Sequence, residues 1–425
     1  MNPKDALLTC INSIDRGAEL TIIAAAGNDP HYGLPGISRS RNPRVTLSVG
    51  SRTFVAVEDP SYELKTATWG TRAWTFQEAL LSRRRLVFTD SQIYFQCLRM
   101  HCVEGIEHNH MVVYGALKDE TRAFPRRGIG HQASDIYSRL EEYYMRQLSF
   151  NTDILNAVSG ILQTFTRMRA GEFKKSAAHF YGIPIVVQGV GSIDTIRANA
   201  RASFALGLAW TISTGSHYNP SNVTRSDAGD EFFPSWTWAS FKANRPNPGS
   251  HHLNFLQWGR LPSVFEGPRQ VLFFSRQGLS MPLENYVQRA CDYTAFLPLV
   301  ELTTLVMPGL LLCKNTAEVA ISSAPSPSMH FSALRRAIVF LHLEASSVAT
   351  NVTAVYVGGS RDQKRSEVVL ILVEAVDESQ YRQVGVCVLT VVENDWSERM
   401  NESAASILQE QSDGREWEWQ ALRMV

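Results

Sequence analysis

The chain has 425 residues, enough for two or three domains of ordinary size. It is 44% hydrophobic, and its 41 lysines and arginines balance its 41 aspartates and glutamates. This zero net charge gives no indication of a strongly basic protein that binds nucleic acid or anionic membranes. The six cysteines form no disulfide framework, and no apolar run approaches the roughly 18 residues of a membrane-spanning helix. We therefore expect a cytoplasmic protein with neither nucleic acid nor membrane as partner.

The first predicted element is a strand over residues 20–26, "LTIIAAA". A continuous apolar run that ends in turn-forming residues is typical of a strand buried on both faces of a parallel sheet. The loop after it holds residues that favour tight turns, namely Gly27, Asp29, Gly33, Pro35 and Gly36. Ligands of open α/β sheets bind outside the carboxyl ends of strands. This loop is therefore either one wall of a site or a plain surface loop.

A hairpin is predicted next, over "RVTLSVGSRTFVAVE", with Gly50 and Ser51 as its two-residue turn. Further along, residues 86–88 and 92–97 predict a second strand pair around a Thr-Asp-Ser turn. Between these two pairs lies a helical pattern that carries the candidate site.

The spacing predicts a helix over residues 72–85, with Thr71 as its N-cap and the three arginines 83–85 in its last turn. Gln77 falls inside the apolar arc of this helix, and Glu78 lies at its edge. A buried amide without a partner costs roughly 1–3 kcal/mol and a carboxylate more, so both side chains need partners. Either they bond neighbouring backbone or an arginine, or Glu78 projects into a cleft where burial raises its pKa for acid/base work.

The character of the chain changes near residue 130. Helical spacing runs through residues 134–149 and 152–168, and a further helix is predicted over residues 195–211. Beyond about residue 230 the chain becomes β-rich, with candidate strands such as "SWTWASF", "QVLFFSR" and "EVVLILVEAV". In the first of these, Trp236 and Trp238 predict one face of a core strand.

These patterns divide the chain into three predicted parts: residues 1–125, a helical segment over residues 130–230, and a β-rich region over residues 231–425. The predicted fold class is α/β for the first part, followed by an α+β arrangement.

One group of metal-binding residue types occurs in "CLRMHCVEGIEHNH", which holds Cys97, His101, Cys102, His108 and His110. Their spacing matches no standard zinc site, and Cys97 already belongs to the inward face of a predicted strand. We therefore predict no metal and no cofactor.

Two segments resemble the signatures of the heterokaryon-incompatibility (HET) domain of filamentous fungi. The family has an apolar strand ending in Ala-Ala-Gly, a Gly-Leu-Pro-Gly loop, and then Arg-Gly-Trp-x-x-Gln-Glu-Arg-x-Leu-Ser. Here these become Ala25-Ala26-Gly27, Gly33-Leu34-Pro35-Gly36, and a third run that contains Arg72, Trp74, Gln77 and Glu78. Ala73 stands where the family has Gly, and Ala79 where it has Arg.

The resemblance implies a fungal allorecognition protein that promotes programmed cell death through self-association or an unknown protein partner. It also implies a TIR-like, flavodoxin-like sheet in the first part. Some TIR domains cleave NAD with a glutamate carried on a helix, so the alternative is an NAD hydrolase that uses Glu78; whether the chain is an enzyme stays open. The family's "WIDALCINQ" strand has no counterpart here, so we expect an N-terminally truncated HET domain, which would be non-functional if the lost strand is essential.

Overall fold

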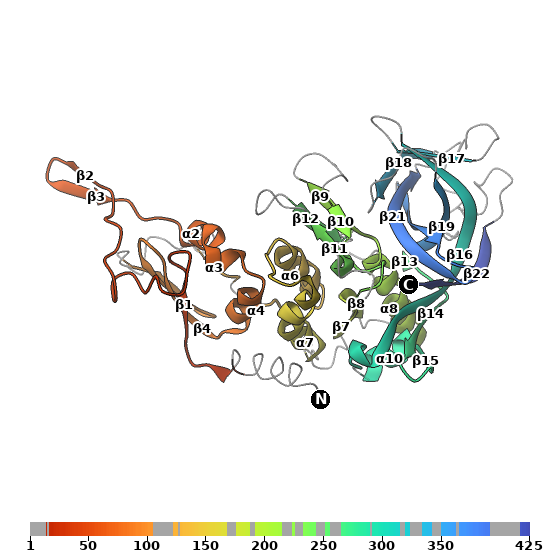
Figure 1. Ribbon diagram of the computed structural model, residues 1–425, viewed down its shortest axis with the longest axis horizontal. Helices are drawn as coiled ribbons and strands as arrows, with labels where there is room; N and C mark the ends of the chain where they lie inside the picture. Colours follow the sequence, from red (N-terminus) through yellow and green to blue (C-terminus); the bar gives the residue numbers. More distant parts are fainter. Residues whose placement is uncertain are drawn as a thin grey trace. The chain divides into compact units, whose positions relative to one another are not determined.

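The computed structural model describes most of the chain, namely residues 14, 17–104, 122–125, 128–167, 176–187, 192–214, 223–225, 233–243, 251–255, 265–289, 291–314, 319–323, 334–341, 350–362, 365–391 and 417–425. Helices and sheets both contribute, which confirms the predicted mixed α/β class. The chain forms two compact units, residues 1–164 and residues 165–425 (Figure 1). The boundary falls inside the predicted helical segment, and the division into three parts stays a prediction.

The first unit is built on a four-stranded sheet in the order β1-β4-β5-β6. Its strands are β1 (Thr21–Ala24), β4 (Arg84–Phe88), β5 (Ile93–Cys97) and β6 (His101–Val103). Only β1 and β4 pair in parallel, with Ile23 opposite Val87; the other two pairs are antiparallel. The expected parallel sheet is therefore a mixed one, because β4, β5 and β6 follow one another through short turns that allow only antiparallel pairing.

The expectation that the first strand is buried on both faces is wrong. Burial alternates along β1: Ile23 is 2% exposed, whereas Ile22 is 59% exposed. The reason is that the core of this unit, which includes Ile23, Leu64, Ala79, Val87 and Tyr94, lies on one face of the sheet only. The apolar run of the sequence thus corresponds to an edge strand of the sheet, and one face of that strand is open to solvent.

Between β3 and β4 the structure has the helices α2 (Pro60–Thr66), α3 (Thr68–Thr71) and α4 (Trp74–Leu81). The helix predicted over residues 72–85 is shorter than expected at both ends. Thr71 ends α3 instead of capping α4, and Ser82 adopts an extended backbone with ψ 134° that stops the helix. The second and third arginines of the "RRR" run consequently lie in β4 and not in a helical turn.

The predicted hairpin is confirmed as β2 (Thr46–Val49) and β3 (Arg52–Val55). Val49 pairs with Arg52, so Gly50 and Ser51 are the two-residue turn, and Gly50 has the positive φ of 62° that such turns require. After the sheet, α6 (Asp135–Tyr144) buries Ile136, Leu140 and Tyr143 as predicted.

The helix expected over residues 152–168 begins as two 3-10 turns, η1 (Asn151–Asp153) and η2 (Asn156–Val158), before α7 (Ser159–Arg167). The hydroxyl of Tyr143 donates to the carbonyl of Ile154 at 2.6 Å, which joins this segment to α6. The break into shorter turns therefore coincides with a backbone carbonyl that bonds a side chain.

The second unit begins with the hairpin of β7 (Ser176–Phe180) and β8 (Ile183–Val187), followed by α8 (Ile193–Gly207). The description of residues 130–230 as helical is thus incomplete. Shorter elements follow: β9 (Trp210–Thr214) with β12 (His251–Phe255), β10 (Val223–Arg225) with β11 (Phe241–Ala243), and η4 (Trp238–Ser240). Between β14 (Gln270–Ser275) with β15 (Ser280–Pro282) and the later strands lie α10 (Leu283–Arg289) and η5 (Tyr293–Ala295).

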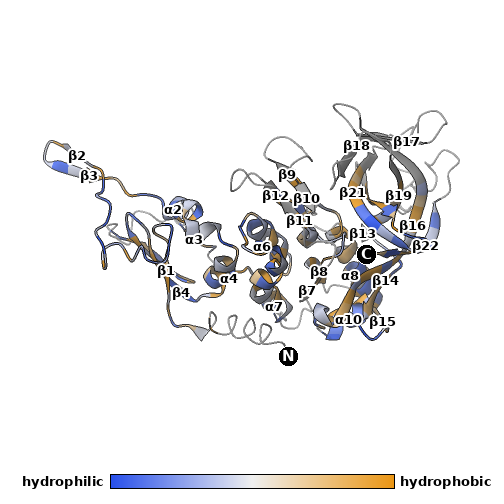
Figure 2. Ribbon diagram, in the orientation of Figure 1, coloured by the Kyte–Doolittle hydropathy of each residue, from blue (hydrophilic) through white to orange (hydrophobic). Residues whose placement is uncertain are grey.

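A ten-stranded sheet forms the rest of this unit and confirms the predicted β-rich end of the chain. Besides β14 and β15 it contains β13 (Phe265–Glu266), β16 (Phe296–Lys314), β17 (Val319–Ser323), β18 (Leu334–Leu341), β19 (Thr350–Asp362), β20 (Arg365–Ala375), β21 (Gln380–Val391) and β22 (Glu418–Met424). The long strand β16 pairs with both β19 and β22, so the order β16-β19-β20-β21-β22 closes on itself. Figure 2 shows hydrophobic residues along these strands, and Val368 to Val373 of β20 are buried.

An aromatic cluster fills the core beside this sheet. Phe180 stacks on Phe273 with ring centroids 3.8 Å apart and lies parallel to Trp236 at 5.8 Å. Edge contacts to Phe204 and Tyr286 surround it. Edge-on arrangements such as the contacts to Phe204 and Tyr286 are favourable for aromatic rings, so these contacts contribute more than their buried area alone.

Trp236 and Trp238 are fully buried, as expected, but they do not lie on a strand. Trp238 donates its indole N–H to the carbonyl of Gly182 at 3.0 Å, and Thr237 donates its hydroxyl to the carbonyl of Tyr181 at 2.6 Å. Tyr181 and Gly182 form the β7–β8 turn with φ values of 47° and 84°. The segment is therefore a turn shaped by bonds to a distant hairpin, and its spacing of two does not come from a strand.

His179 gives this unit a pH dependence. Burial lowers its pKa from 6.5 to about 4, against the opposing effect of Asp292. Between these values the unfolded chain binds the proton and the folded chain does not, so stability falls as the pH is lowered from about 6.5 to about 4. We expect a loss of about 2–3 kcal/mol. Urea unfolding across this range should show the loss in the natural chain and a flatter profile in His179→Asn; parallel profiles would contradict the assignment.

Among the helices that the structure describes, none is long and apolar enough to cross a bilayer.

Candidate functional site

The two segments that carry the predicted site meet around α4. The hydroxyls of Thr21, at the start of β1, and Ser82, just after α4, are 2.7 Å apart. Ser82 donates to the carbonyl of Glu78 at 2.5 Å. At the other end of the strand, the backbone N–H groups of Ala25 and Ala26 both donate to the carbonyl of Phe88. Two stretches about forty residues apart therefore form one continuous piece of structure.

The N-terminal end of α4 is held by the segment after α6. Ala73 donates its backbone N–H to the carbonyl of Gln147 at 2.8 Å, and Gln147 donates its own to Thr71 at 2.6 Å. The guanidinium of Arg146 lies 4.6 Å over the ring of Phe76 and donates to the carbonyl of Arg72. Burial lowers the pKa of Arg146 to about 10, so it stays charged at neutral pH.

Gln77 fixes the middle of the same helix. Its side chain is 1% exposed, and its Oε1 accepts the backbone N–H of Gly160 at 3.1 Å. Of the two alternatives, bonding to backbone is the one the structure shows for Gln77. A buried N–H group without its acceptor is costly, so Gln77 ties α4 to the start of α7.

Arg85 closes the C-terminal end of α4. Although it lies on β4, its side chain is 1% exposed and reaches back to donate from Nε to the carbonyl of Ala79 and from Nη2 to that of Leu80. The guanidinium also lies 4.9 Å from the ring centre of Phe124, and burial lowers its pKa to about 10. The positive charge that we expected at the end of this helix is present, but a strand supplies it.

Trp74 and Glu78 are the partly exposed side chains of α4, and their spacing of four places them on one face. The side chain of Arg72 is exposed, and its backbone carbonyl accepts hydrogen bonds from the side chains of Thr75 and Arg146.

Helix α4 runs into β4 through Ser82, so Glu78 lies towards the amino ends of β1 and β4. The loop over residues 27–36 follows the carboxyl end of β1. The structure therefore places Glu78 and this loop at opposite ends of the strand.

The loop itself is a tightly held turn. Gly27, Gly33 and Gly36 all have positive φ, and a Cβ on Gly27 would come within 2.1 Å of the ring of Tyr32. Asp29 accepts the backbone N–H of His31 at 2.8 Å, and the carbonyl of Pro35 accepts from Arg41. These five predicted site residues shape the loop, and no bond recorded for them reaches α4 within the described part of the chain.

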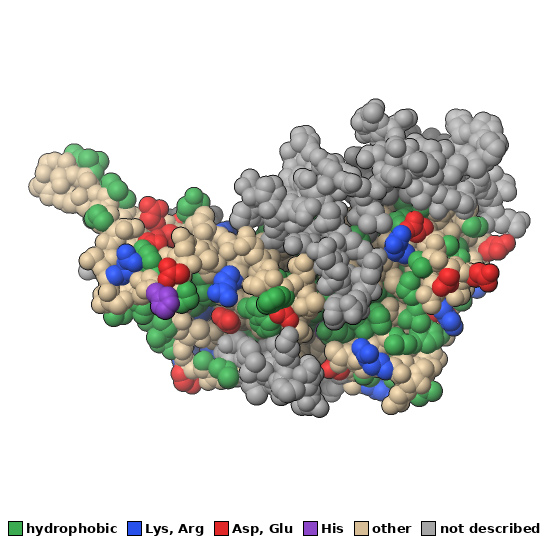
Figure 3. Space-filling view, viewed as in Figure 1, with side chains coloured by type: hydrophobic (Ala, Val, Ile, Leu, Met, Phe, Trp, Pro, Cys, Tyr) green, Lys and Arg blue, Asp and Glu red, His purple; other side chains and the backbone are tan. Residues whose placement is uncertain are grey.

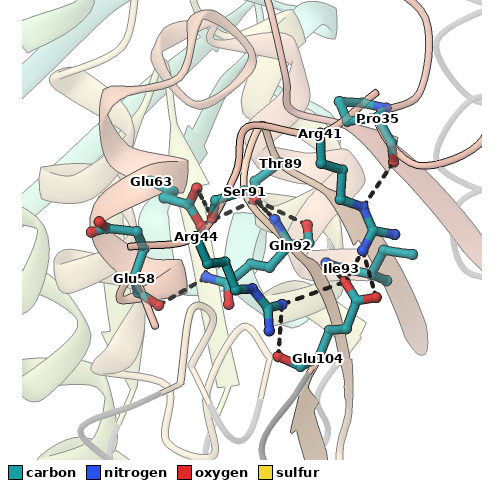
Figure 4. A network of polar contacts seen from close by, with 10 residues as sticks. All are labelled: Pro35, Arg41, Arg44, Glu58, Glu63, Thr89, Ser91, Gln92, Ile93 and Glu104. Carbon is teal, nitrogen blue, oxygen red and sulfur yellow. Dashed lines mark hydrogen bonds and ion pairs between the residues drawn. The ribbon is translucent and has the colours of Figure 1, made fainter. Parts of the chain in front are cut away.

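A polar network that the sequence did not reveal lies next to this loop (Figure 4). Glu104, just after β6, bonds Arg41, lies 3.8 Å from Arg44, and accepts the backbone N–H of Ile93 at 2.9 Å. Burial alone would raise the pKa of Glu104, but the bonds from Arg41 and Ile93 together lower it. Nothing in the spacing of these residues signals the contact, because more than sixty positions separate Arg41 from Glu104.

Glu63 of α2 forms the second half of this network. Its carboxylate accepts hydrogen bonds from the hydroxyls of Thr89 and Ser91 and from the side-chain amide of Gln92, at 3.0, 2.7 and 2.7 Å. All three donors belong to the β4–β5 turn. The carboxylate therefore fastens α2 to that turn through three hydrogen bonds.

Within the described residues, no three His, Cys, Asp or Glu side chains lie close enough together to hold a metal ion. His108 and His110 of the cysteine–histidine segment lie outside the residues that the structure describes.

Comparison with known proteins adds no relative: no protein-family model, no curated protein and no solved structure matches this chain.

Proposed function

We propose that this chain is a fungal HET-domain signalling protein that promotes programmed cell death in allorecognition and acts in the cytoplasm through self-association or a protein partner. The observation that carries the proposal is the joining of the two resembling segments. They are far apart in the sequence, yet Thr21 bonds Ser82, and β1 pairs with β4 along its whole length. Segments that together define one functional unit are expected to meet in this way.

A TIR-like, flavodoxin-like origin of the first unit is part of the same proposal. The parallel pair β1–β4, joined through helices, agrees with such a sheet. The antiparallel strands β5 and β6 depart from it. Fold alone does not establish activity, so the proposal rests on the site and its test.

The clamped state of α4 supports signalling more than chemistry. Gln77, Arg85 and Arg146 all bond backbone carbonyls or N–H groups, and each holds the helix in place. What α4 presents outward is the half-exposed pair Trp74 and Glu78. A partly exposed tryptophan on a rigid helix suits recognition by another protein surface, where aromatic rings are enriched and glutamates are depleted.

Cleavage of NAD by Glu78 is the second candidate, because a half-buried carboxylate beside an indole ring is one setting for acid/base work. The position of Glu78 at the amino ends of the strands gives less support, since ligands of open α/β sheets bind at the carboxyl ends. The two candidates differ in what Glu78→Gln does.

We expect inducible expression of the chain in a filamentous fungus to arrest growth. Glu78→Gln should arrest growth to the same extent, with cellular NAD unchanged, because it keeps the size and polarity of the side chain. If expression of the natural chain leaves growth at the uninduced rate, the signalling role is contradicted. If expression of the natural chain lowers cellular NAD and Glu78→Gln abolishes that fall, the NAD hydrolase becomes the favoured function.

A further inference from the structure

The hairpin β2–β3 has one apolar face. Leu47 lies opposite Phe54 and Val49 opposite Arg52, and the backbone bond from Ala56 to Val45 continues the register. Because alternate side chains share a face, Val45, Leu47, Val49 and Phe54 lie together, and we call them the hairpin face. The opposite side carries Thr46, Ser48 and Thr53 with Val55.

All four side chains of the hairpin face are exposed, at 75%, 63%, 59% and 56% in chain order. Figure 3 shows hydrophobic side chains on this projecting hairpin, which Figure 1 labels β2 and β3. The hairpin face presents on the order of 400 Å² of apolar surface, as large as the largest patch on many monomers. An isolated two-stranded hairpin is only marginally stable in water, so such a face is expected to gain a cover.

The base of the hairpin is fixed from both sides. Before β2, Asn42 donates its backbone N–H to the carbonyl of Asp90, and Arg44 donates to the carbonyl of Glu104 at 3.0 Å. After β3, the carbonyl of Glu58 accepts from the side chain of Gln92 at 2.8 Å, as Figure 4 shows. These bonds hold the hairpin at the β4–β5 turn, so its face is presented on a defined base.

Charges at the two ends of the hairpin make it complementary to a second copy of itself. Arg52 lies at the tip on the apolar face, and Glu58 lies at the base, six residues or roughly 20 Å further along. Both side chains are exposed, and neither has an ion-pair partner among the residues that the structure describes. When two hairpins pack face to face in opposite directions, each Arg52 comes over the Glu58 of the other copy.

We propose that the hairpin face is a self-association site at which two copies of this chain pack antiparallel about a twofold axis. Such an interface is the same patch on both copies, and two sheets packed face to face lie about 10 Å apart. The apolar area is about half of the roughly 800 Å² that each partner contributes to a stable specific interface. The pair is therefore weak and forms at high local concentration.

Sedimentation velocity of the full chain over a range of micromolar concentrations tests the site. The natural chain should show a concentration-dependent monomer–dimer equilibrium, and Phe54→Ser or Leu47→Ser should weaken it roughly tenfold or more. Val55→Ser is the matched control, because Val55 is 48% exposed on the opposite side of the same strand; it should leave the equilibrium unchanged. A chain that is monomeric throughout, or an equal effect of Val55→Ser, would overturn the proposal.

A charge exchange tests the antiparallel geometry. At low salt, Arg52→Glu and Glu58→Arg should each weaken association, because like charges then meet at both ends of the interface. An equimolar mixture of the two variants should associate again, since opposite charges meet at both ends in the mixed pair. Continued loss in the mixture would exclude this geometry, and binding only of another protein would assign the face to a different occupant.

This inference names the surface for the self-association part of the proposed function, but it is measured on purified chain. If the natural chain is monomeric and still arrests growth, the hairpin site is contradicted and the signalling role is retained. If the chain dimerises but does not arrest growth, the hairpin site is retained and the signalling role is contradicted.

Discussion

Phe180→Ala is expected to lower the free energy of unfolding of the second unit by about 3–5 kcal/mol. Phe180 is fully buried, stacks on Phe273 at 3.8 Å and contacts Trp236, Phe204 and Tyr286. Its removal leaves a cavity that these large rings cannot fill, and the loss includes their favourable mutual geometry. Amide hydrogen exchange of the full chain should rise strongly in peptides that cover residues 176–187 and 270–275.

Phe274→Ala provides the matched control for this substitution. Phe274 neighbours Phe273 on β14 but is only partly buried, and it lies over the guanidinium of Arg423 at 5.4 Å. We expect a loss of at most about 1 kcal/mol, as for other substitutions near the surface. Equal effects of the two variants would show that the cluster around Phe180 is not the core of this unit.

Gly70→Ala should destabilise the first unit by about 3 kcal/mol or more. A Cβ at Gly70 would lie 1.7 Å from the carbonyl oxygen of Leu64 in α2, and that oxygen belongs to backbone that cannot rotate away. Either α3 separates from α2 or the first turn of the following helix shifts. Exchange in peptides from α2 to α4 should report the change, and under the proposed function growth arrest should disappear.

Gly50→Ala distinguishes this steric effect from the general cost of replacing glycine. Gly50 has a φ of 62°, but nothing lies within 4 Å of a Cβ built there. Its substitution should cost about 1 kcal/mol through backbone strain alone. Gly70→Ala with a loss no larger than this would contradict the close approach of α2 and α3.

Short-range sequence patterns predicted the elements whose conformation depends on residues close together in the chain. Gly50 marked the β2–β3 turn because few other residues accept its backbone conformation. The spacing of Ile136, Leu140 and Tyr143 predicted the buried side of α6, since each lies one turn from the next. For β1, the apolar run predicted a strand of a parallel sheet but neither its neighbour β4 nor its open face, because such a run does not reveal how many layers cover the strand.

The candidate site was only partly visible for the same reason. Gln77 drew attention as a buried amide, and its partner Gly160 lies 83 positions away, beyond the reach of any pattern. Arg85 was expected in the last turn of a helix, whereas it lies on β4 opposite Thr21 with its side chain turned inward. Trp236 and Trp238 followed a strand's spacing, yet bonds to a turn 56 residues earlier bend the chain there.

The arginine that spans from β4 to the carbonyls of α4 has a consequence for how this region assembles. A helix of eight residues is well below the length at which helices persist alone in water, roughly 12–15 residues. The carbonyls of Ala79 and Leu80 gain the Arg85 side chain as donor only once Arg85 is seated in β4. Helix and strand therefore form and melt as one cooperative block, and a peptide cut after Ser82 should be a random coil.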